Sequence, residues 1–242
     1  EVVPIVDTIQ NLLNIPAVIT NDANAAAVGE MRFGSAQGMK NFVLITLGTG
    51  LGGGIVVDGK LVHGHHGLAG EMGHIVVRPD GRKCNCGNQG CLETYASATG
   101  IKRTVFKFMA DMTGTSPLRQ IPFNELDAEM ITEAALKGDR LASNAFIYTG
   151  EILGTKLADT VAYLNPEAII LSGGLTRAGD LLLKPTLEYM EKYMFPVFRG
   201  KIKLLTSKLD GANTAVLGAG ALAWDYIENN TNSESLVLET VH

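Results

Sequence analysis

The 242-residue sequence predicts a mixed α/β fold. A strand hairpin comes first, because the apolar run Asn41–Leu47 is followed by Ile55–Asp58 and Lys60–Val62, with the turn signal Asp58-Gly59 between them. A helix–strand–helix succession follows, centred on the apolar run Ala168–Ser172. Apolar residues make up 46% of the chain and charged residues 19%, so there is material for a core and general disorder is excluded.

Three elements are predicted before the hairpin. Val2–Leu13 can form a helix that places apolar side chains on one face. The short apolar run Ala17–Thr20 predicts a buried strand that ends at Asn21-Asp22. The alanine-rich stretch Ala23–Met31 has good helix propensity and is broken by the glycines that follow it.

The later part of the chain is mostly helical. Apolar spacing of three and four residues predicts the long helix Asn144–Leu164, which Pro166 closes. After the strand Ala168–Ser172, one more strand is expected at Ile202–Thr206, and the tail Glu228–His242 is polar. The remaining predicted helices are Ile101–Met112, Ala128–Lys137, Leu181–Tyr193 and Thr214–Ile227.

Charge and composition exclude several classes of protein. The net charge is −5 and aromatic residues make up 6%, which gives no support for a nucleic-acid-binding face. No apolar run reaches about 18 residues, so no membrane-spanning helix is expected. The chain opens at Glu1 without a signal sequence, and its three cysteines are clustered, so we expect a reducing, cytoplasmic setting.

Glycine is the most over-represented residue, with 28 copies, and five of these fall between Gly48 and Gly54. The loop formally contains G-x-G-x-x-G, but it joins a strand to a strand, whereas a dinucleotide fingerprint opens a helix. A glycine hairpin exposes backbone N–H groups that can approach phosphate oxygens, and the Thr49 hydroxyl adds a donor. We therefore predict phosphate binding here, with a merely flexible hairpin as the alternative.

The three cysteines, Cys84, Cys86 and Cys91, follow His74 at the spacing His-x₉-Cys-x-Cys-x₄-Cys. Three thiols and one imidazole form the ligand set that suits tetrahedral zinc. The alternative is a set of reduced, packed cysteines. Rival histidine ligands stand nearby at His63, His65 and His66.

Two carboxylates flank this metal loop, and a further polar pair precedes the alanine-rich helix. Glu71 and Glu93 can accept hydrogen bonds from the hydroxyls of a polyol, or they are ordinary surface glutamates. Asn21 and Asp22 stand where a short strand meets a helix, which is also where helix caps occur. Both functions are compatible, with Asn21 capping the helix and Asp22 taking a proton from a hydroxyl.

A second glycine turn, Ser172-Gly173-Gly174, follows the strand Ala168–Ser172. It can hold the sugar or base of a nucleotide, or it is simply a tight strand-to-helix turn.

Four motifs in order resemble those of the ROK family (repressor, open reading frame, kinase), and within it the bacterial glucokinases. They are N-D-A-N-A-A-A (Asn21–Ala27), L-G-T-G-L-G-G-G (Leu47–Gly54), G-E-M-G-H (Gly70–His74) and C-N-C-G-N-Q-G-C-L-E (Cys84–Glu93). The resemblance runs from about Asn21 to Ala221. The zinc motif coupled to E-x-G-H is specific, whereas the glycine loops alone are not.

The resemblance implies an actin-like ATPase fold, of the ribonuclease H type, in which a hexose and ATP bind between two lobes. It implies that Asp22 is the general base toward the sugar 6-hydroxyl and that ATP acts together with Mg²⁺. It further implies a structural Zn²⁺ and a homodimer. The implied sugar ligands are Asn21, Asp22, Glu71, His74 and Glu93, the implied nucleotide ligands are Gly48, Thr49, Gly50, Gly173 and Gly174, and the implied zinc ligands are His74, Cys84, Cys86 and Cys91.

The resemblance also predicts how the chain is divided. The family's first phosphate loop, an acidic strand with a Gly-Gly-Thr turn, has no counterpart before Asn21. We therefore expect residues 1–33 to be a remnant of an N-terminal lobe and residues 34–227 to be an essentially complete C-terminal lobe. The zinc loop would span 74–91 and the polar tail 228–242. An ATP-dependent glucokinase is the first functional expectation.

Three alternatives remain open at this point. One is the effector domain of a sugar-responsive ROK repressor. Another is a ROK kinase for N-acetylmannosamine, N-acetylglucosamine or fructose. The third is a degenerate, regulatory domain that binds a sugar but transfers nothing.

Overall fold

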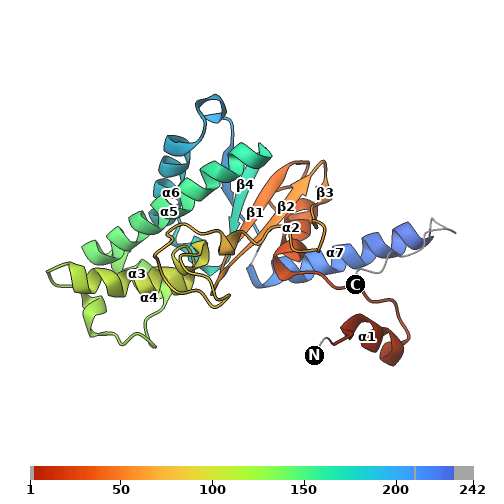
Figure 1. Ribbon diagram of the computed structural model, residues 1–242, viewed down its shortest axis with the longest axis horizontal. Coiled ribbons are helices and arrows are strands. Elements are labelled where there is room, and N and C mark those ends of the chain that lie inside the picture. The colour runs from red at the N-terminus through yellow and green to blue at the C-terminus, as the bar shows by residue number, and fades with distance from the viewer. Residues whose placement is uncertain (1–2, 210, 232–242) are drawn as a thin grey trace.

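The computed structural model describes residues 3–209 and 211–231, which form a five-stranded mixed sheet with helices on both faces (Figure 1). The strand order is β3-β2-β1-β4-β5. Strands β1 (Phe42–Leu47), β2 (Leu51–Val57) and β3 (Lys60–Leu61) pair antiparallel, whereas β4 (Ala168–Ser172) pairs parallel to β1, and β5 (Lys203–Thr206) parallel to β4. The mixed α/β prediction is confirmed.

Strands β1 and β4 are buried on both faces, which explains their uninterrupted apolar sequences. Phe42 and Leu44 of β1 face a core shared with α2 (Asp22–Phe33). Val43, Ile45 and Leu47 face the opposite core. That second core is built with α3 (Ala98–Asp111), α4 (Ala128–Leu136), α5 (Arg140–Leu164) and α6 (Asp180–Tyr193).

Helix α7 (Gly211–Thr231) packs beside α2 on the first face of the sheet. Short 3-10 helices connect the larger elements: η1 (Met72–His74), η2 (Leu92–Thr94), η3 (Pro117–Gln120), η4 (Gly174–Ala178) and η5 (Pro196–Phe198). Within the described residues, no helix is both long and apolar enough to cross a bilayer.

Most predicted elements occur within a few residues of their predicted bounds, and side-chain caps explain the differences. Helix α3 begins at Ala98 because the Ser97 hydroxyl accepts a hydrogen bond from the Gly100 N–H at 2.9 Å. Helix α5 begins before the predicted Asn144 because Asp139 accepts from the Ala142 N–H at 2.8 Å. Helix α7 extends to Thr231, and the rest of the predicted polar tail lies outside the described residues.

The predicted strand Ala17–Thr20 is wrong. These residues form no strand, and Val18 and Ile19 are 49% and 69% exposed. A strand needs a neighbour that satisfies its backbone hydrogen bonds, and no described strand lies beside this segment. Helix α1 (Ile5–Leu13), which precedes it, has no buried residue and stands apart from the body of the molecule (Figure 1).

Candidate active site

A cavity of about 530 Å³ lies at the carboxyl ends of β1 and β4, where ligands of open α/β sheets commonly bind. Its wall brings together most of the predicted site residues, from five separate parts of the chain. These are Asn21, Asp22, Gly48, Thr49, Gly50, Glu71, Glu93 and Gly173. His74, Gly174 and the three cysteines are not part of this wall.

Asn21 and Asp22 stand at the start of α2, on the cavity wall. Asn21 has extended backbone angles and its Oδ1 accepts a hydrogen bond from the Ala23 N–H at 2.8 Å, so the predicted helix cap is confirmed. Asp22 Oδ1 accepts from the same N–H at 2.8 Å. The other Asp22 oxygen forms no hydrogen bond with a described residue, so it is available to a ligand.

The first glycine turn is shorter than predicted. Its tip is Gly48–Gly50, and β2 already begins at Leu51. The Gly48 N–H donates to the Gly50 carbonyl at 3.1 Å, and the Gly48 carbonyl accepts from the Ala98 N–H at 2.9 Å. Gly48 therefore lines the cavity without a free N–H, so only Thr49 and Gly50 remain as candidates for the predicted phosphate donors.

The other glycines of this motif, Gly52–Gly54, lie within strand β2. Their lack of a side chain lets neighbouring elements approach the strand closely. A Cβ on Gly54 would lie 2.6 Å from the Cβ of Ala27, and a Cβ on Gly52 would lie 3.0 Å from that of Ala23. A Cβ on Gly53 would lie 2.5 Å from the Gly70 carbonyl oxygen. The contacts of Gly52 and Gly54 pack α2 closely against β2. This packing positions the Asn21–Asp22 pair beside the glycine turn.

The second glycine turn meets the first strand directly. Gly173 has φ +96° and ψ 171°, a region essentially restricted to glycine. A Cβ there would lie 2.6 Å from the Leu47 carbonyl oxygen and 2.9 Å from the Leu47 nitrogen. Gly174 begins η4, and a Cβ added there would meet only open space.

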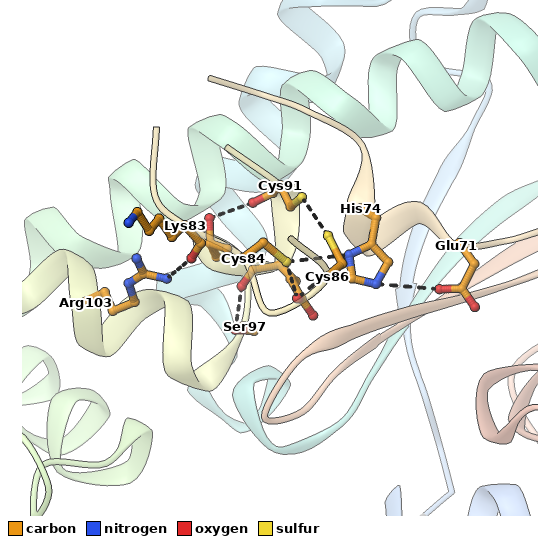
Figure 2. Close-up of polar contacts among 10 residues, drawn as sticks. Glu71, His74, Lys83, Cys84, Cys86, Cys91, Ser97 and Arg103 are labelled. Atoms are coloured by element: carbon orange, nitrogen blue, oxygen red, sulfur yellow. Dashed lines mark hydrogen bonds and ion pairs between the residues drawn. The ribbon is translucent and has the colours of Figure 1, made fainter. Parts of the chain in front are cut away.

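The side chains of His74, Cys84, Cys86 and Cys91 converge, with one ligand atom from each lying within 4.8 Å of the others (Figure 2). Cys84 Sγ is 3.7 Å from His74 Nδ1, and Cys86 Sγ is 3.7 Å from Cys91 Sγ. Tetrahedral zinc with bonds of about 2.3 Å places neighbouring sulfur ligands about 3.8 Å apart, so the donor set fits zinc in type and spacing. His63, His65 and His66 do not belong to this group.

The thiols differ in acidity because their surroundings differ. Burial, together with a hydrogen bond to Glu93, raises the pKa of Cys84 to about 12, and burial also raises the pKa of Cys91. A hydrogen bond from the Asn88 backbone N–H lowers the pKa of the exposed Cys86. A metal ion binds thiolates, so its binding here would release protons.

This thiol–imidazole group is connected to the cavity through two carboxylates. Figure 2 shows His74 between Cys84 and Glu71, and its Nε2 lies 3.9 Å from Glu71 Oε2. The Cys84 thiol donates to Glu93 Oε1 at 2.9 Å. Glu93 also borders the glycine turn, since a Cβ on Gly50 would lie 2.8 Å from its Oε2.

Arg82 has a structural role that no sequence pattern indicates. Its guanidinium donates to the carbonyl oxygens of Thr94 and Gly100 at 2.6 and 2.9 Å, and to the Thr104 hydroxyl at 2.9 Å. It lies 4.4 Å from the centre of the Tyr95 ring, and burial lowers its pKa. Arg82 thereby fastens the cysteine loop to α3.

Several further parts of the cavity wall were not predicted as site residues. They include Asn24 of α2, Ala215 of α7 and the segment from Gly67 to Ala69. Asn24 stands among alanines in a helix, and the segment carries no charged side chain, so neither has a distinct signature.

Comparison with known proteins identifies relatives over almost the whole chain. The model of the ROK family matches residues 1–226. A glucokinase of Halalkalibacterium halodurans is 41% identical over 221 residues, which cover 90% of this chain and 67% of that protein. The DNA-binding transcriptional dual regulator NagC of Escherichia coli is 31% identical over 218 residues, covering 90% of this chain and 52% of the regulator.

Comparison with solved structures identifies the same family from the fold. The ROK family glucokinase from Streptomyces griseus, crystallised with glucose and AMPPNP, superimposes with a TM-score of 0.81 at 36% identity. The match covers 92% of this chain and 72% of that one. The fold is therefore the actin-like ATPase fold of the ROK sugar kinases.

Proposed function

The chain belongs to the ROK family, and we propose that it is an ATP-dependent sugar kinase that phosphorylates the 6-hydroxyl of a hexose, with glucose as the expected acceptor. One observation carries this proposal. A single cavity holds a carboxylate with a free oxygen, Asp22, together with a glycine turn whose N–H groups suit phosphate, Thr49–Gly50. The glucokinase relatives and the glucose complex of a related structure support the same function.

In this proposal Asp22 takes the proton from the attacking 6-hydroxyl. A positioned base contributes about 10²–10⁴ in rate. Asn21, Glu71 and Glu93 accept or donate hydrogen bonds to the other sugar hydroxyls. His74 presents Nε2 toward the sugar side, while its Nδ1 faces the thiols.

The phosphoryl donor lies along the two glycine turns. Thr49 and Gly50 donate to phosphate oxygens, and Gly173 and Gly174 border the adenosine. Phosphoryl transfer depends mainly on positioning and on the stabilisation of negative charge, so a wall shared by both substrates is the central requirement.

Two metal ions enter the proposal with different roles. Zn²⁺ bound by His74, Cys84, Cys86 and Cys91 would be structural, because four protein ligands leave no position for water. No other group of described residues gathers metal ligands this closely, so we propose that Mg²⁺ is held chiefly by the nucleotide phosphates. Bound there, Mg²⁺ would neutralise charge on the transferred group.

The division into a remnant of an N-terminal lobe (1–33), a C-terminal lobe (34–227) and a tail (228–242) remains part of this proposal. So does the assembly of the chain into a homodimer.

The test is turnover with ATP on a panel of hexoses and N-acetylhexosamines, for the wild type and for Asp22→Asn. We expect the highest kcat/KM with glucose. The variant should lose about 10²–10⁴ in kcat with a nearly unchanged sugar KM. An unchanged kcat would refute the assignment of Asp22.

NagC-like relatives make sugar-responsive regulation the second candidate function. Sugar binding without turnover on any member of the panel would favour that function over the kinase.

A further inference from the structure

Asn24 carries a feature that the proposed reaction does not use. It is the third residue of α2, is 3% exposed and lines the cavity. Its Oδ1 is buried and has no hydrogen-bond partner among the residues that the structure describes. A buried polar atom without a partner destabilises the folded protein, so it requires an explanation.

The helix places Asn24 on a buried side of α2 that borders the cavity. Ala23 packs against Gly52 of β2. The carbonyl oxygen of Ala25 lies so close to Gly218 of α7 that a Cβ there would overlap it. Successive helical residues turn by about 100°, so Asn24 lies between these two directions, on a third side of α2. The cavity wall also contains Gly67 to Ala69, the segment that leads to Glu71.

This direction leads away from the nucleotide turn. Ala26 is about 200° around the helix from Asn24. It belongs to the core cluster that contains Leu44 of β1 and Ile170 of β4. Ala26 lines the same cavity, and strand β4 leads into Gly173, so Ala26 faces the side of the cavity nearer the Gly173 turn and Asn24 faces away from it.

We propose that Asn24 is a further sugar-binding residue, whose amide pairs with one hydroxyl of the acceptor hexose. This inference rests on the proposed function of the cavity. An amide offers both a donor and an acceptor, and a sugar hydroxyl offers both in return. Because the Asn24 oxygen has no partner within residues 3–209 and 211–231, its hydrogen bond is made only when the sugar is bound.

The test compares Asn24→Ala with Val28→Ala. Val28 is one turn further along α2 and is 2% exposed, but it is not part of the cavity wall. We expect Asn24→Ala to raise the Kd for glucose about tenfold, measured by calorimetry without nucleotide, and to leave the melting temperature unchanged or higher. Val28→Ala should lower the melting temperature and leave the Kd unchanged.

Deoxyglucoses then identify the hydroxyl. Removal of the hydroxyl that Asn24 binds should weaken binding to the wild type about tenfold and binding to Asn24→Ala hardly at all. A lower melting temperature with unchanged affinity would show a structural role and overturn the proposal. A change in the Kd for ADP alone, or equal losses with every deoxyglucose in both proteins, would overturn it as well.

Because these readouts are equilibrium binding, they separate this inference from the proposed kinase activity. Sugar binding with the expected Asn24 effect but without turnover would refute the kinase and retain Asn24. Failure of the wild type to bind any sugar would refute both.

Discussion

Gly173→Ala is the most direct test of how the nucleotide side of the cavity is built. The wild-type glycine combines φ +96° with ψ 171°, and a non-glycine residue in such a region costs about 1–3 kcal/mol. The added Cβ would also lie 2.6–2.9 Å from three backbone atoms of Leu47, in the centre of the sheet. Forced overpacking of this kind costs about 1–3 kcal/mol more.

Together these effects predict a loss of about 2–6 kcal/mol in the free energy of unfolding. For a chain of this size, each kcal/mol lowers the melting temperature by about 2–4 °C, so a decrease of roughly 5–20 °C is expected. Thermal unfolding followed by circular dichroism measures it, and calorimetric titration with ADP should show weakened binding in the same variant.

Gly174→Ala is the matched control, since a Cβ at Gly174 meets only open space. We expect its melting temperature to remain within about 2 °C of the wild type. If Gly173→Ala is as stable as Gly174→Ala, the strain and the close approach to Leu47 do not determine this turn, and the reasoning fails.

Three other perturbations test separate parts of the structure. Metal analysis should find about one zinc per chain, and Cys91→Ser should lower both the zinc content and the melting temperature. A metal-free protein as stable as the zinc-containing one would contradict the Cys₃His site. Arg82→Ala should cost about 1–3 kcal/mol in the free energy of unfolding, measured by urea unfolding, because it removes the charged donor of the Thr94 carbonyl, whereas the Gly100 carbonyl still accepts from the Thr104 hydroxyl; a loss under about 0.5 kcal/mol would show that water replaces Arg82. The pKa of Glu167 is lowered, first by a hydrogen bond from the Asn41 N–H and then by one from the Lys40 N–H. The ionised carboxylate therefore stabilises the fold at pH values above its unfolded pKa of about 4.3. This contribution is lost as the pH falls through the lower pKa of the folded state. The stability difference between wild type and Glu167→Gln should therefore be present at pH 7 and disappear at acidic pH, and a difference independent of pH would contradict it.

The sequence predicts the fold well where local pattern and tertiary environment agree. Strand β4 occurs at the predicted residues because a short, uninterrupted apolar run is what a strand covered on both faces requires. Ala17–Thr20 has the same local pattern and is not a strand, because pairing depends on a neighbouring strand that local pattern cannot supply.

The site shows a similar limit. Glycine has low strand propensity, so the sequence predicts a loop at Gly52–Gly54, whereas close packing with α2 and the Gly70 segment places these residues in β2. The motif residues converge on one cavity because chemistry-bearing residues fall at the ends of strands and in the loops between them. Asn24 could not be found, since its significance lies in a missing partner, which only coordinates reveal.

The closeness of Glu93 to Gly50 has a consequence for how two ligands bound in the cavity affect each other's affinity. The carboxylate that borders the Gly48–Gly50 turn is also the acceptor of the Cys84 thiol and part of the cavity wall. A bound sugar that repositions Glu93 would therefore change the surroundings of the Gly48–Gly50 turn. Thermodynamic linkage makes that effect reciprocal, so any factor by which the sugar changes nucleotide affinity is the factor by which the nucleotide changes sugar affinity.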